Sequence, residues 1–578
     1  MKKLFIVALT LFSLLSAVAQ QRTAFVRVGS QDESVQEFFP GEIRARPVWG
    51  NYTGGRYMGL FCGGQDLASS RDWYADKRWG DQGDGTFANP VLNADFSDPD
   101  VIRVGDKYYM TCSEFHFMGM PILESEDMVN WQVVSHIFSS IDLVGYSSME
   151  KYGGGTWAPA LRYHDGRYYM YVCTPDEGLF MSSATDIKGP WDPLYQVKNV
   201  SGWEDPCPYW DEDGQAYLGR SQLGGGPIIL HKMSADGRKL LDGGKEIYRG
   251  NTAEGTKIFK KDGYYYLSIP EGGVGSGWQT VLRSKTIYGP YERKVVLERG
   301  STNINGPHQG ALVDTPEGEW WFYHFQSTGA LGRVVHLQPV TWEDGFPTIG
   351  YDYDGNGVGE PMKICPKPNV GKTVAPHAPQ GSDDFSETTL HPMWQFNHNP
   401  DNDHWSLSKR EGWLTITPML AKNLREARNQ FTQKLIGYEG QATVKIDFAE
   451  LNDYSRTGME CIGSKYVGVG IRKSQGNVQI YIENEGTVKI LSTLEKSDNH
   501  IAYIRLNFDA QQKHFQFSYS FDGQSFTNAG DHFEESDRDW KGCRVGLYSY
   551  TTSTTQEGGT AYFDDFIYQF DGPNLINK

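Results

Sequence analysis

A unit of roughly 50 residues occurs five times in this chain, and the repeat limits the possible fold more than any other feature. The first copy, residues 94–110, joins a Ser-Asp-Pro-Asp turn to a short apolar run, a Gly-Asp turn and an aromatic run. The other four copies repeat the apolar run, a glycine-containing turn and the aromatic run. The residues that lead the five copies are Asp98, Ala158, Asp205, Glu254 and His308.

One such unit cannot bury both faces of its own small sheet, so neighbouring units must stack on one another. Short strands joined by Asp-Gly turns are typical of antiparallel hairpins, and four-stranded sheets that stack around an axis form a propeller. We therefore predict an all-β chain that contains a five-bladed β-propeller over residues 87–350.

The leading residues of the copies are the candidate functional site. If each occupies the same place near the inner strand of its blade, the five converge on the central axis. Three of them, Asp98, Asp205 and Glu254, are acids. Grouping like charges in a partly buried site costs free energy. One acid alone could simply cap a turn, but three at matched positions indicate a functional site.

The rest of the chain divides into four segments. Residues 1–19 hold two lysines, an apolar run and Ala-Val-Ala, which predict a secretory signal peptide. Residues 20–86 are rich in glycine and aromatic residues, which predicts an extension that packs on the propeller. Residues 351–382 contain repeated prolines and predict a stiff linker. Residues 383–578 show alternating strand patterns, and we expect a β-sandwich.

Charge and cysteine content indicate the compartment and the partners. The formal net charge is −18, and without residues 1–19 it is near −20, from 52 basic and 72 acidic residues. Such an excess of acids argues against nucleic acid or an anionic membrane as partner. No cysteine follows the expected cleavage position, and no later apolar run is long enough to span a bilayer. We therefore expect a periplasmic or secreted protein, whose seven cysteines are buried free thiols rather than a disulfide framework.

The chemistry of the three acids narrows the reaction class. The sequence has no Gly-x-Ser-x-Gly elbow, no phosphate-binding loop and no His-Glu-x-x-His zinc motif. Glycoside hydrolysis instead requires two carboxyl groups, one protonated as general acid and one ionised. A third carboxylate beside the acid would raise the pKa of that acid by like-charge repulsion and would orient it.

Seven short motifs follow one another along the chain, at residues 94–100, 155–159, 203–206, 253–255, 306–310, 331–333 and 339–345. Taken in this order, they resemble the motifs of glycoside hydrolase family 43, and the resemblance spans about residues 87–365. Residues 383–570 resemble the concanavalin-A-like, jelly-roll sandwich that follows the propeller in β-xylosidases and α-L-arabinofuranosidases of that family. The resemblance implies an inverting exo-hydrolase that releases terminal β-D-xylose or α-L-arabinofuranose from plant cell-wall polysaccharides or oligosaccharides.

The resemblance also implies a role for each site residue. Asp98 matches the general base, Glu254 the general acid and Asp205 the carboxylate that modulates the acid. Arg333 matches an arginine that contacts the innermost sugar. His308 matches a histidine that in some members helps to hold a hydrated calcium ion, although the chemistry itself needs no cofactor. Inversion predicts that the carboxyls of base and acid lie about 6.5–9.5 Å apart, with Asp205 nearer to the acid than the base is.

Neighbouring residues leave alternatives open. Trp157, Phe115 and Phe117 are candidate sugar-stacking platforms, with core packing as the equal alternative. Asp95 is expected to be a turn acid, and the orientation of Asp100 is open. The fourth copy also departs from the family, because Gly-Thr-Lys follows its acid where many members have Gly-Pro-His. Because of this departure, the substrate contacts next to the acid cannot be carried over from the family.

Two other functions fit the architecture. Five-bladed fructan and sucrose hydrolases retain configuration, but their Asn-Asp-Pro-Asn and Arg-Asp-Pro patterns are replaced here by Ser-Asp-Pro-Asp and Glu-Asp-Pro. A non-catalytic glycan-binding propeller would not need all three acids. The sequence therefore favours the pentose-releasing hydrolase.

Overall fold

The computed structural model describes residues 79–572 except 116, 149–150, 152, 305, 464, 495–498 and 536–540, together with the backbone of three earlier strands. These three strands form an antiparallel sheet in the order β1-β3-β2. The expected signal peptide, and most of the expected N-terminal extension, lie outside the described residues. The strands are β1 (Phe25–Val28), β2 (Ile43–Pro47) and β3 (Arg56–Cys62).

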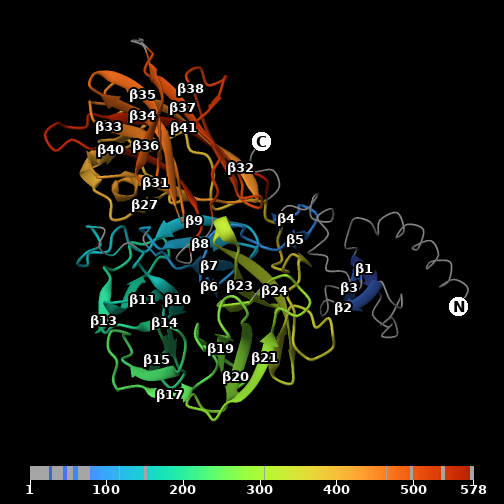
Figure 1. Ribbon diagram of the computed structural model, residues 1–578. Coiled ribbons are helices and arrows are strands. Elements are labelled where there is room, and N and C mark those ends of the chain that lie inside the picture. The colour runs from blue at the N-terminus through green and yellow to red at the C-terminus, as the bar shows by residue number, and fades with distance from the viewer. Residues whose placement is uncertain are drawn as a thin grey trace, which may run out of the picture.

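Five four-stranded antiparallel sheets form the predicted propeller (Figure 1). Within each sheet the strands are neighbours in chain order, so every blade is a simple meander. The prediction of an all-β fold with five blades is confirmed. The blades are β6 (Asp100–Val104), β7 (Lys107–Thr111), β8 (Pro121–Ser125) and β9 (Trp131–His136); β10 (Trp157–His164), β11 (Arg167–Thr174), β12 (Gly178–Ala184) and β13 (Tyr195–Asn199); β14 (Trp203–Trp210), β15 (Ala216–Gln222), β16 (Ile228–Met233) and β17 (Lys245–Tyr248); β18 (Lys257–Lys261), β19 (Tyr264–Glu271), β20 (Trp278–Ser284) and β21 (Glu292–Leu297); β22 (Leu312–Asp314), β23 (Trp320–Ser327), β24 (Arg333–Glu343) and β25 (Phe346–Ile349).

The first hairpin of every blade turns through a glycine with positive φ. A residue with a Cβ pays a steric cost in this left-handed conformation, which tight hairpin turns require. The repeated glycine of the sequence is therefore explained by backbone geometry. The five turn glycines are Gly105 (φ 66°), Gly166 (77°), Gly214 (84°), Gly263 (71°) and Gly318 (87°).

The first and last blades close the ring without exchanging a strand. Arg103 of β6 donates two hydrogen bonds, of 3.0 and 2.8 Å, to the carboxylate of Asp314 on β22. The Tyr323 hydroxyl of β23 donates to the backbone oxygen of Met128 at 2.7 Å. Closure is therefore made by side chains that reach between blades one and five.

The second domain is a sandwich of two mainly antiparallel sheets (Figure 1). One sheet has the order β27-β31-β40-β33-β34-β35-β36, with β30 beside β40, and the other has the order β28-β29-β41-β32-β37-β38-β39. The strands are β27 (Gln395–Asn397), β28 (Trp405–Ser406), β29 (Leu414–Ile416), β30 (Met419–Leu420), β31 (Gln430–Lys434), β32 (Glu439–Asp447), β33 (Ser455–Ile462), β34 (Tyr466–Ser474), β35 (Asn477–Asn484), β36 (Thr487–Leu494), β37 (Ile501–Asp509), β38 (His514–Ser520), β39 (Thr527–Asn528), β40 (Arg544–Thr551) and β41 (Ala561–Phe570).

The propeller and the sandwich share one hydrophobic core. Buried residues of the propeller, such as Phe96 and Val335, belong to the same contact cluster as Phe431 and Ile436 of the sandwich. Figure 1 shows the sandwich lying against the side of the propeller formed by blade one. Apolar area buried in this shared core contributes to the stability of both domains.

The segment expected to be a linker also contributes a strand. Its strand β26 (Ile364–Pro366) pairs with β5 (Thr86–Ala88), which pairs with β4 (Gly80–Asp81). The indole of Trp79 stacks on Phe570 and donates to the Asp571 carboxylate at 3.2 Å. The described end of the N-terminal extension is therefore held by the linker and the sandwich.

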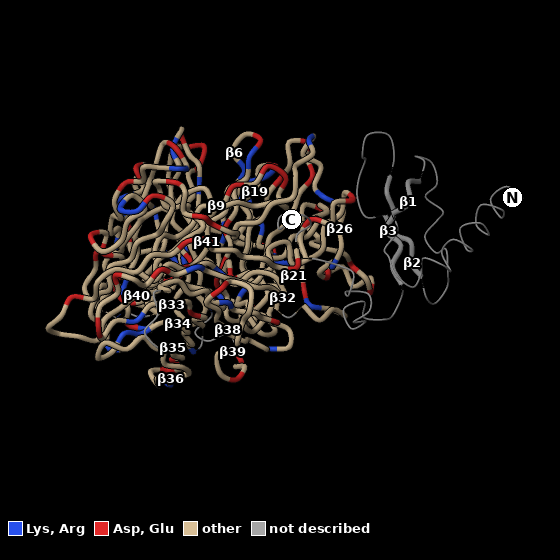
Figure 2. Tube along the Cα trace, turned by 90° about the horizontal axis from the view of Figure 1, so that it is seen from above, with Lys and Arg blue, Asp and Glu red and all other residues tan. Residues whose placement is uncertain are grey.

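The described chain contains three short 3-10 helices, and its charged residues do not gather on one side. Figure 2 shows acidic and basic positions intermixed around the described chain. No helix among the described residues is long and apolar enough to cross a membrane. Six cysteines are buried free thiols, as predicted, and the seventh lies outside the residues whose side chains are described. The short 3-10 helices are η1 (Gly329–Leu331), η2 (Asn402–His404) and η3 (Leu424–Glu426).

Candidate active site

The backbone corrects the alignment of the five repeats. Near the start of the inner strand of each blade, either shortly before it or within its first three residues, one residue adopts a positive φ, a conformation that is uncommon for residues other than glycine. In blades four and five this residue comes one position after the acid and the histidine that the sequence alignment placed as leaders. The equivalent residues are Asp98 (φ 53°), Ala158 (39°), Asp205 (54°), Gly255 (58°) and Gln309 (39°).

Hydrogen bonds support the corrected register. The hydroxyl of Ser113 donates to Asp98 at 2.6 Å, and in blade three the hydroxyl of Ser221 donates to Asp205 at 2.9 Å. Asp98 and Asp205 are therefore equivalent, and the residues just before the positive-φ position form a second equivalent set. That set is Ser97, Trp157, Glu204, Glu254 and His308.

The carboxylate of Asp98 is buried and held by three donors. Its side chain accepts hydrogen bonds from the hydroxyls of Ser97 (2.9 Å) and Ser113 (2.6 Å) on Oδ2, and from Nη1 of Arg333 (2.8 Å) on Oδ1. Donors of this kind stabilise the ionised form. A carboxylate oxygen can accept more than one hydrogen bond, so Oδ1 retains capacity for a water molecule.

Asp205 lies beside Glu254, as the sequence predicted for a modulating carboxylate. Its Oδ2 accepts from the backbone N–H of Gly255 at 2.6 Å. One carboxyl oxygen from each of Glu204, Asp205 and Glu254 lies within 4.8 Å of the others, and Asp98 is not part of this group. Burial, followed by the charge of Glu254, raises the pKa of Asp205 to about 7.

Glu254 is the most accessible of these acids and is paired with His308. Its side chain is 15 % exposed, and Oε1 lies 2.6 Å from Nε2 of His308. The Nδ1 atom of His308 is buried and has no hydrogen-bond partner in the part of the chain that the structure describes. We infer that the neutral imidazole carries its proton on Nε2, because the reverse tautomer would bury an unpaired N–H. This arrangement directs the acid proton to Oε2.

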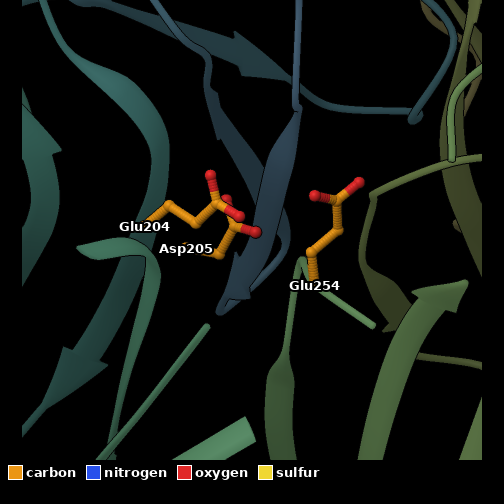
Figure 3. Close-up of side chains that lie close together, drawn as sticks. All are labelled: Glu204, Asp205 and Glu254. Atoms are coloured by element: carbon orange, nitrogen blue, oxygen red, sulfur yellow. The ribbon is translucent and has the colours of Figure 1, made fainter. Parts of the chain in front are cut away.

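Glu204 is a functional candidate that the sequence interpretation missed. It is 7 % exposed, and Figure 3 shows its carboxyl beside that of Asp205, facing Glu254. Burial, together with the charges of Asp205 and Glu254, raises the pKa of Glu204 to about 9. The misaligned repeat hid this residue, because it placed Asp205 opposite Glu254 and left Glu204 as a spacer.

The acids that flank the base have structural roles. Asp95 accepts a hydrogen bond from the backbone N–H of Arg333 at 2.9 Å, which fixes the arginine that holds Asp98. Asp100 accepts from Nη1 of Arg162 at 2.6 Å and lies 3.6 Å from Nζ of Lys257. Asp100 therefore joins blades one, two and four and is not available as the base.

The departure in the fourth repeat has a structural reason. The Lys257 ammonium donates to the backbone oxygen of Pro159 at 3.0 Å and approaches Asp100, so it is directed to the contact between blades. Its side chain is 7 % exposed. Where many family members have a histidine, this chain therefore has a lysine that pairs with Asp100 between the blades.

The three aromatic candidates differ in position. Trp157 is half-buried, meets Phe115 edge to face at 5.7 Å and donates its N–H to the backbone oxygen of Gly154. Phe117 is 3 % exposed and lies under the guanidinium of Arg544, 3.6 Å from the ring centre. A sugar-stacking platform needs an open ring face. Phe117 has none, and it packs against the sandwich domain instead.

Comparisons with known proteins agree with this geometry. Residues 87–347 match the model of glycosyl hydrolases family 43, and residues 382–569 match the β-xylosidase C-terminal concanavalin A-like domain. A Xylanibacter ruminicola protein with a provisional β-xylosidase name is 53 % identical over 81 % of this chain and 87 % of its own. A β-xylosidase of Formosa agariphila is 37 % identical over 86 % and 93 % of the two chains.

A third relative carries a different activity in its name. The non-reducing end α-L-arabinofuranosidase BoGH43B of Bacteroides ovatus is 32 % identical over 57 % of this chain and 65 % of its own. The fold and the acid cluster define a five-bladed glycoside hydrolase. The chain belongs to glycoside hydrolase family 43.

Proposed function

We propose that the protein is an inverting exo-glycoside hydrolase that releases terminal β-D-xylose from xylan-derived chains. The observation that carries the proposal is the division of the acids into two groups. Asp98 is held as a carboxylate by Arg333, whereas Glu254 shares a cluster with Asp205 and Glu204. The names of the two relatives with the highest identity above support β-xylose as the leaving sugar.

Asp98 is suited to activate the attacking water. Its three donors hold the carboxylate in one orientation, and the free capacity on Oδ1 can accept a proton from water. Arg333 is fixed through its own backbone by Asp95 and so keeps the base in place. In this assignment Arg333 also borders the innermost sugar.

Glu254 is suited to protonate the leaving oxygen. Its Oε1 is occupied by His308, so Oε2 carries the proton toward the glycosidic oxygen. The negative charge of Asp205 nearby disfavours loss of that proton before the reaction. One proton moves from the acid to the leaving group while the base takes one from water, which returns the charges to their starting total.

The second candidate is release of α-L-arabinofuranose, which the name of the Bacteroides ovatus relative favours. β-D-xylose is a pyranose without an exocyclic hydroxymethyl group, whereas α-L-arabinofuranose is a furanose that carries one, and the described acids do not by themselves discriminate between the two sugars. The choice depends on contacts around the sugar rather than on the catalytic acids.

Aryl glycosides and plant polysaccharides test the activity and the sugar. We expect release of p-nitrophenol from the β-D-xyloside at a higher kcat/KM than from the α-L-arabinofuranoside, and xylose as the product from xylo-oligosaccharides. The reverse order would assign the arabinofuranosidase activity. No release from either glycoside, or from a panel of plant polysaccharides with product identification, would support a non-catalytic glycan-binding propeller instead.

Proton NMR of the first-formed sugar tests the stereochemistry. A single displacement by water inverts the anomeric centre, so the first product of a β-xyloside is α-xylose. Appearance of β-xylose first would make Asp98 a nucleophile, as in the retaining five-bladed hydrolases. A crystal structure would also test the predicted separation of about 6.5–9.5 Å between the two carboxyls.

The proposal also includes a calcium ion near the propeller axis, and His308 is the residue that suggests it. Its buried, unpartnered Nδ1 could accept a hydrogen bond from a water bound to such an ion. Calcium prefers about six to eight oxygen ligands, whereas the acid–base chemistry already uses the nearby carboxyls. Elemental analysis and thermal melting before and after exhaustive chelation test this point, and unchanged melting with no bound calcium would remove it.

We also propose that the protein is exported and acts on a neutral glycan outside the cytoplasm. The support is the sequence of residues 1–19 and the acidic composition. Fractionation of cells that express the full chain tests this location. Recovery of the uncleaved chain in the cytoplasm would contradict it.

A further inference from the structure

Glu204 is a carboxyl of the site that no step above uses. In blade three it occupies the position that Glu254 occupies in blade four, one residue before the positive-φ residue. The symmetry of the repeat therefore aims both side chains at the same space, and Figure 3 shows their carboxyls facing each other. Placing a second acid opposite the proposed catalytic acid costs free energy by like-charge repulsion, so packing alone does not explain Glu204.

The two oxygens of Glu204 have different surroundings. Oε1 accepts a hydrogen bond from the backbone N–H of Gly225 at 3.2 Å. Oε2 has no hydrogen-bond partner among the described residues, and it is not fully buried. Oε2 is therefore accessible from the site and available to a bound molecule.

Charge determines the form in which Glu204 exists. The groups whose charge most raises the pKa of Glu204, namely Asp205, Glu254 and Asp98, are acids. Of the nearby cations, Arg333 is bound to Asp98, and Arg220 stacks on the ring of the adjacent Trp203 at 3.7 Å. Carboxyls this close cannot all be ionised. Among the described residues Asp205 has two close donors, Ser221 and the Gly255 N–H, whereas Glu204 has one, so the negative charge belongs on Asp205.

We propose that Glu204 is a substrate-binding residue whose neutral carboxyl donates a hydrogen bond from Oε2 to an oxygen of the bound pentose. Oε1 accepts from Gly225 and is the carbonyl oxygen, so Oε2 carries the proton. A carboxyl kept neutral by an environment of burial and like charge can serve as a hydrogen-bond donor. The inference rests on the proposed function, because it assigns a contact to the same sugar.

The experiment compares three replacements by kcat/KM on p-nitrophenyl β-D-xyloside and on xylobiose. Glu204→Gln keeps a neutral donor of the same length, and Glu204→Met keeps the length but removes the donor. We expect Met to lower kcat/KM by about 10- to 100-fold, the effect of losing one buried hydrogen bond, and Gln to lower it several-fold less. Glu246→Met, at an exposed position on β17 of the same blade, should match the wild type.

Two further measurements make the result decisive. Binding of D-xylose, followed by tryptophan fluorescence, should weaken in Glu204→Met more than in Glu204→Gln, and near-ultraviolet circular dichroism should show that both variants are folded. Equal losses in Gln and Met, with the alkaline limb of the pH profile shifted to lower pH, would show that Glu204 acts as an anion and would overturn the proposal. Wild-type activity in Glu204→Met would also overturn it. Failure of the wild type on all pentosides would instead overturn the proposed function.

Discussion

At the scale of single residues, the site separates two kinds of carboxyl by their partners. Asp98 accepts hydrogen bonds from one arginine and two hydroxyls. Glu254 is paired with one histidine and lies beside two other acids. The proposed assignment of acid and base therefore rests on the surroundings of two carboxyl groups rather than on residue type.

Replacing Glu254 by Gln should reveal the leaving-group dependence of general acid catalysis. We expect kcat on xylobiose to fall by about 10²–10⁴-fold, because its leaving oxygen must be protonated. The loss on p-nitrophenyl xyloside should be much smaller, since p-nitrophenolate departs without a proton. Steady-state kinetics on both substrates measure the difference.

Asp98→Asn provides the matched comparison for that experiment. Water activation is needed whatever group leaves, so both substrates should lose activity to a similar extent. If Asp98→Asn spared the aryl glycoside and Glu254→Gln did not, the assignment of acid and base would be reversed.

The pH dependence of stability should report the buried proton on Glu204. Because the folded state raises its pKa to about 9, the folded chain binds a proton that the unfolded chain has released. Stability contributed by this group therefore falls as the pH rises from about 5 to about 9. Glu204→Gln removes the loss, so its melting temperature relative to the wild type should be higher at pH 9 than at pH 5, by on the order of a few degrees.

Calorimetric scans at a fixed rate at the two pH values measure this effect. Glu411→Gln, at an exposed position, serves as the control and should show no such pH dependence. A variant whose melting temperature follows the wild type at both pH values would mean that Glu204 is not protonated in the folded state.

At the scale of elements, the segment that follows strand β7 connects the site to the sandwich. Ser113 holds the base, and the next residue, Glu114, binds Lys434 and Arg544 of the second domain at 2.7 Å each. All three charged side chains of this cluster are buried. Gly155 allows the close approach, because a Cβ there would lie 2.1 Å from the backbone oxygen of Phe115.

Removing one cation from this cluster should destabilise the whole chain. Arg544→Met leaves Glu114 with Lys434 alone in a buried site, and breaking a buried ion pair costs about 3–5 kcal/mol. We expect a reduced free energy of unfolding in guanidinium titrations, with part of it restored in the double variant Arg544→Met/Glu114→Gln. Arg249→Met, which breaks an exposed pair with Glu246, should have little effect. Equal effects of the two single variants would contradict a special role of the buried cluster.

At the scale of the whole molecule, propeller and sandwich are joined through one buried core. Their buried apolar residues form a single cluster, and backbone bridges join Ala94 to Ile436 and Phe117 to Asn397. Because base, supporting loop and sandwich are connected through this contact, we interpret the second domain as a support of the site.

Differential scanning calorimetry should therefore show one transition for the full chain. Domains that share a core cannot unfold separately without exposing it. Two transitions separated by more than about 10 °C, or a stable and active fragment that ends before residue 383, would show instead that the domains are independent. Limited proteolysis at increasing temperature gives a second readout of the same question.

The sequence alone determined the architecture and the main candidates for the site. Five copies of one hairpin pattern required a stacked, closed arrangement, since a single copy cannot bury its faces. The same copies identified Asp98, Asp205 and Glu254 as candidates, because acids at or next to the repeated position converge when the repeats surround an axis. Local patterns of this kind are visible in the sequence because each depends on neighbours within the unit.

Only the tertiary structure decided the register of the repeats and the contacts between distant segments. The backbone conformation showed that Glu204, rather than Asp205, is the counterpart of Glu254, a difference of one residue that spacing could not resolve. Contacts across long separations moved Phe117 from the site to the domain interface and gave Lys257 a structural partner. Such contacts depend on how blades and domains pack, and no pattern within one repeat specifies them.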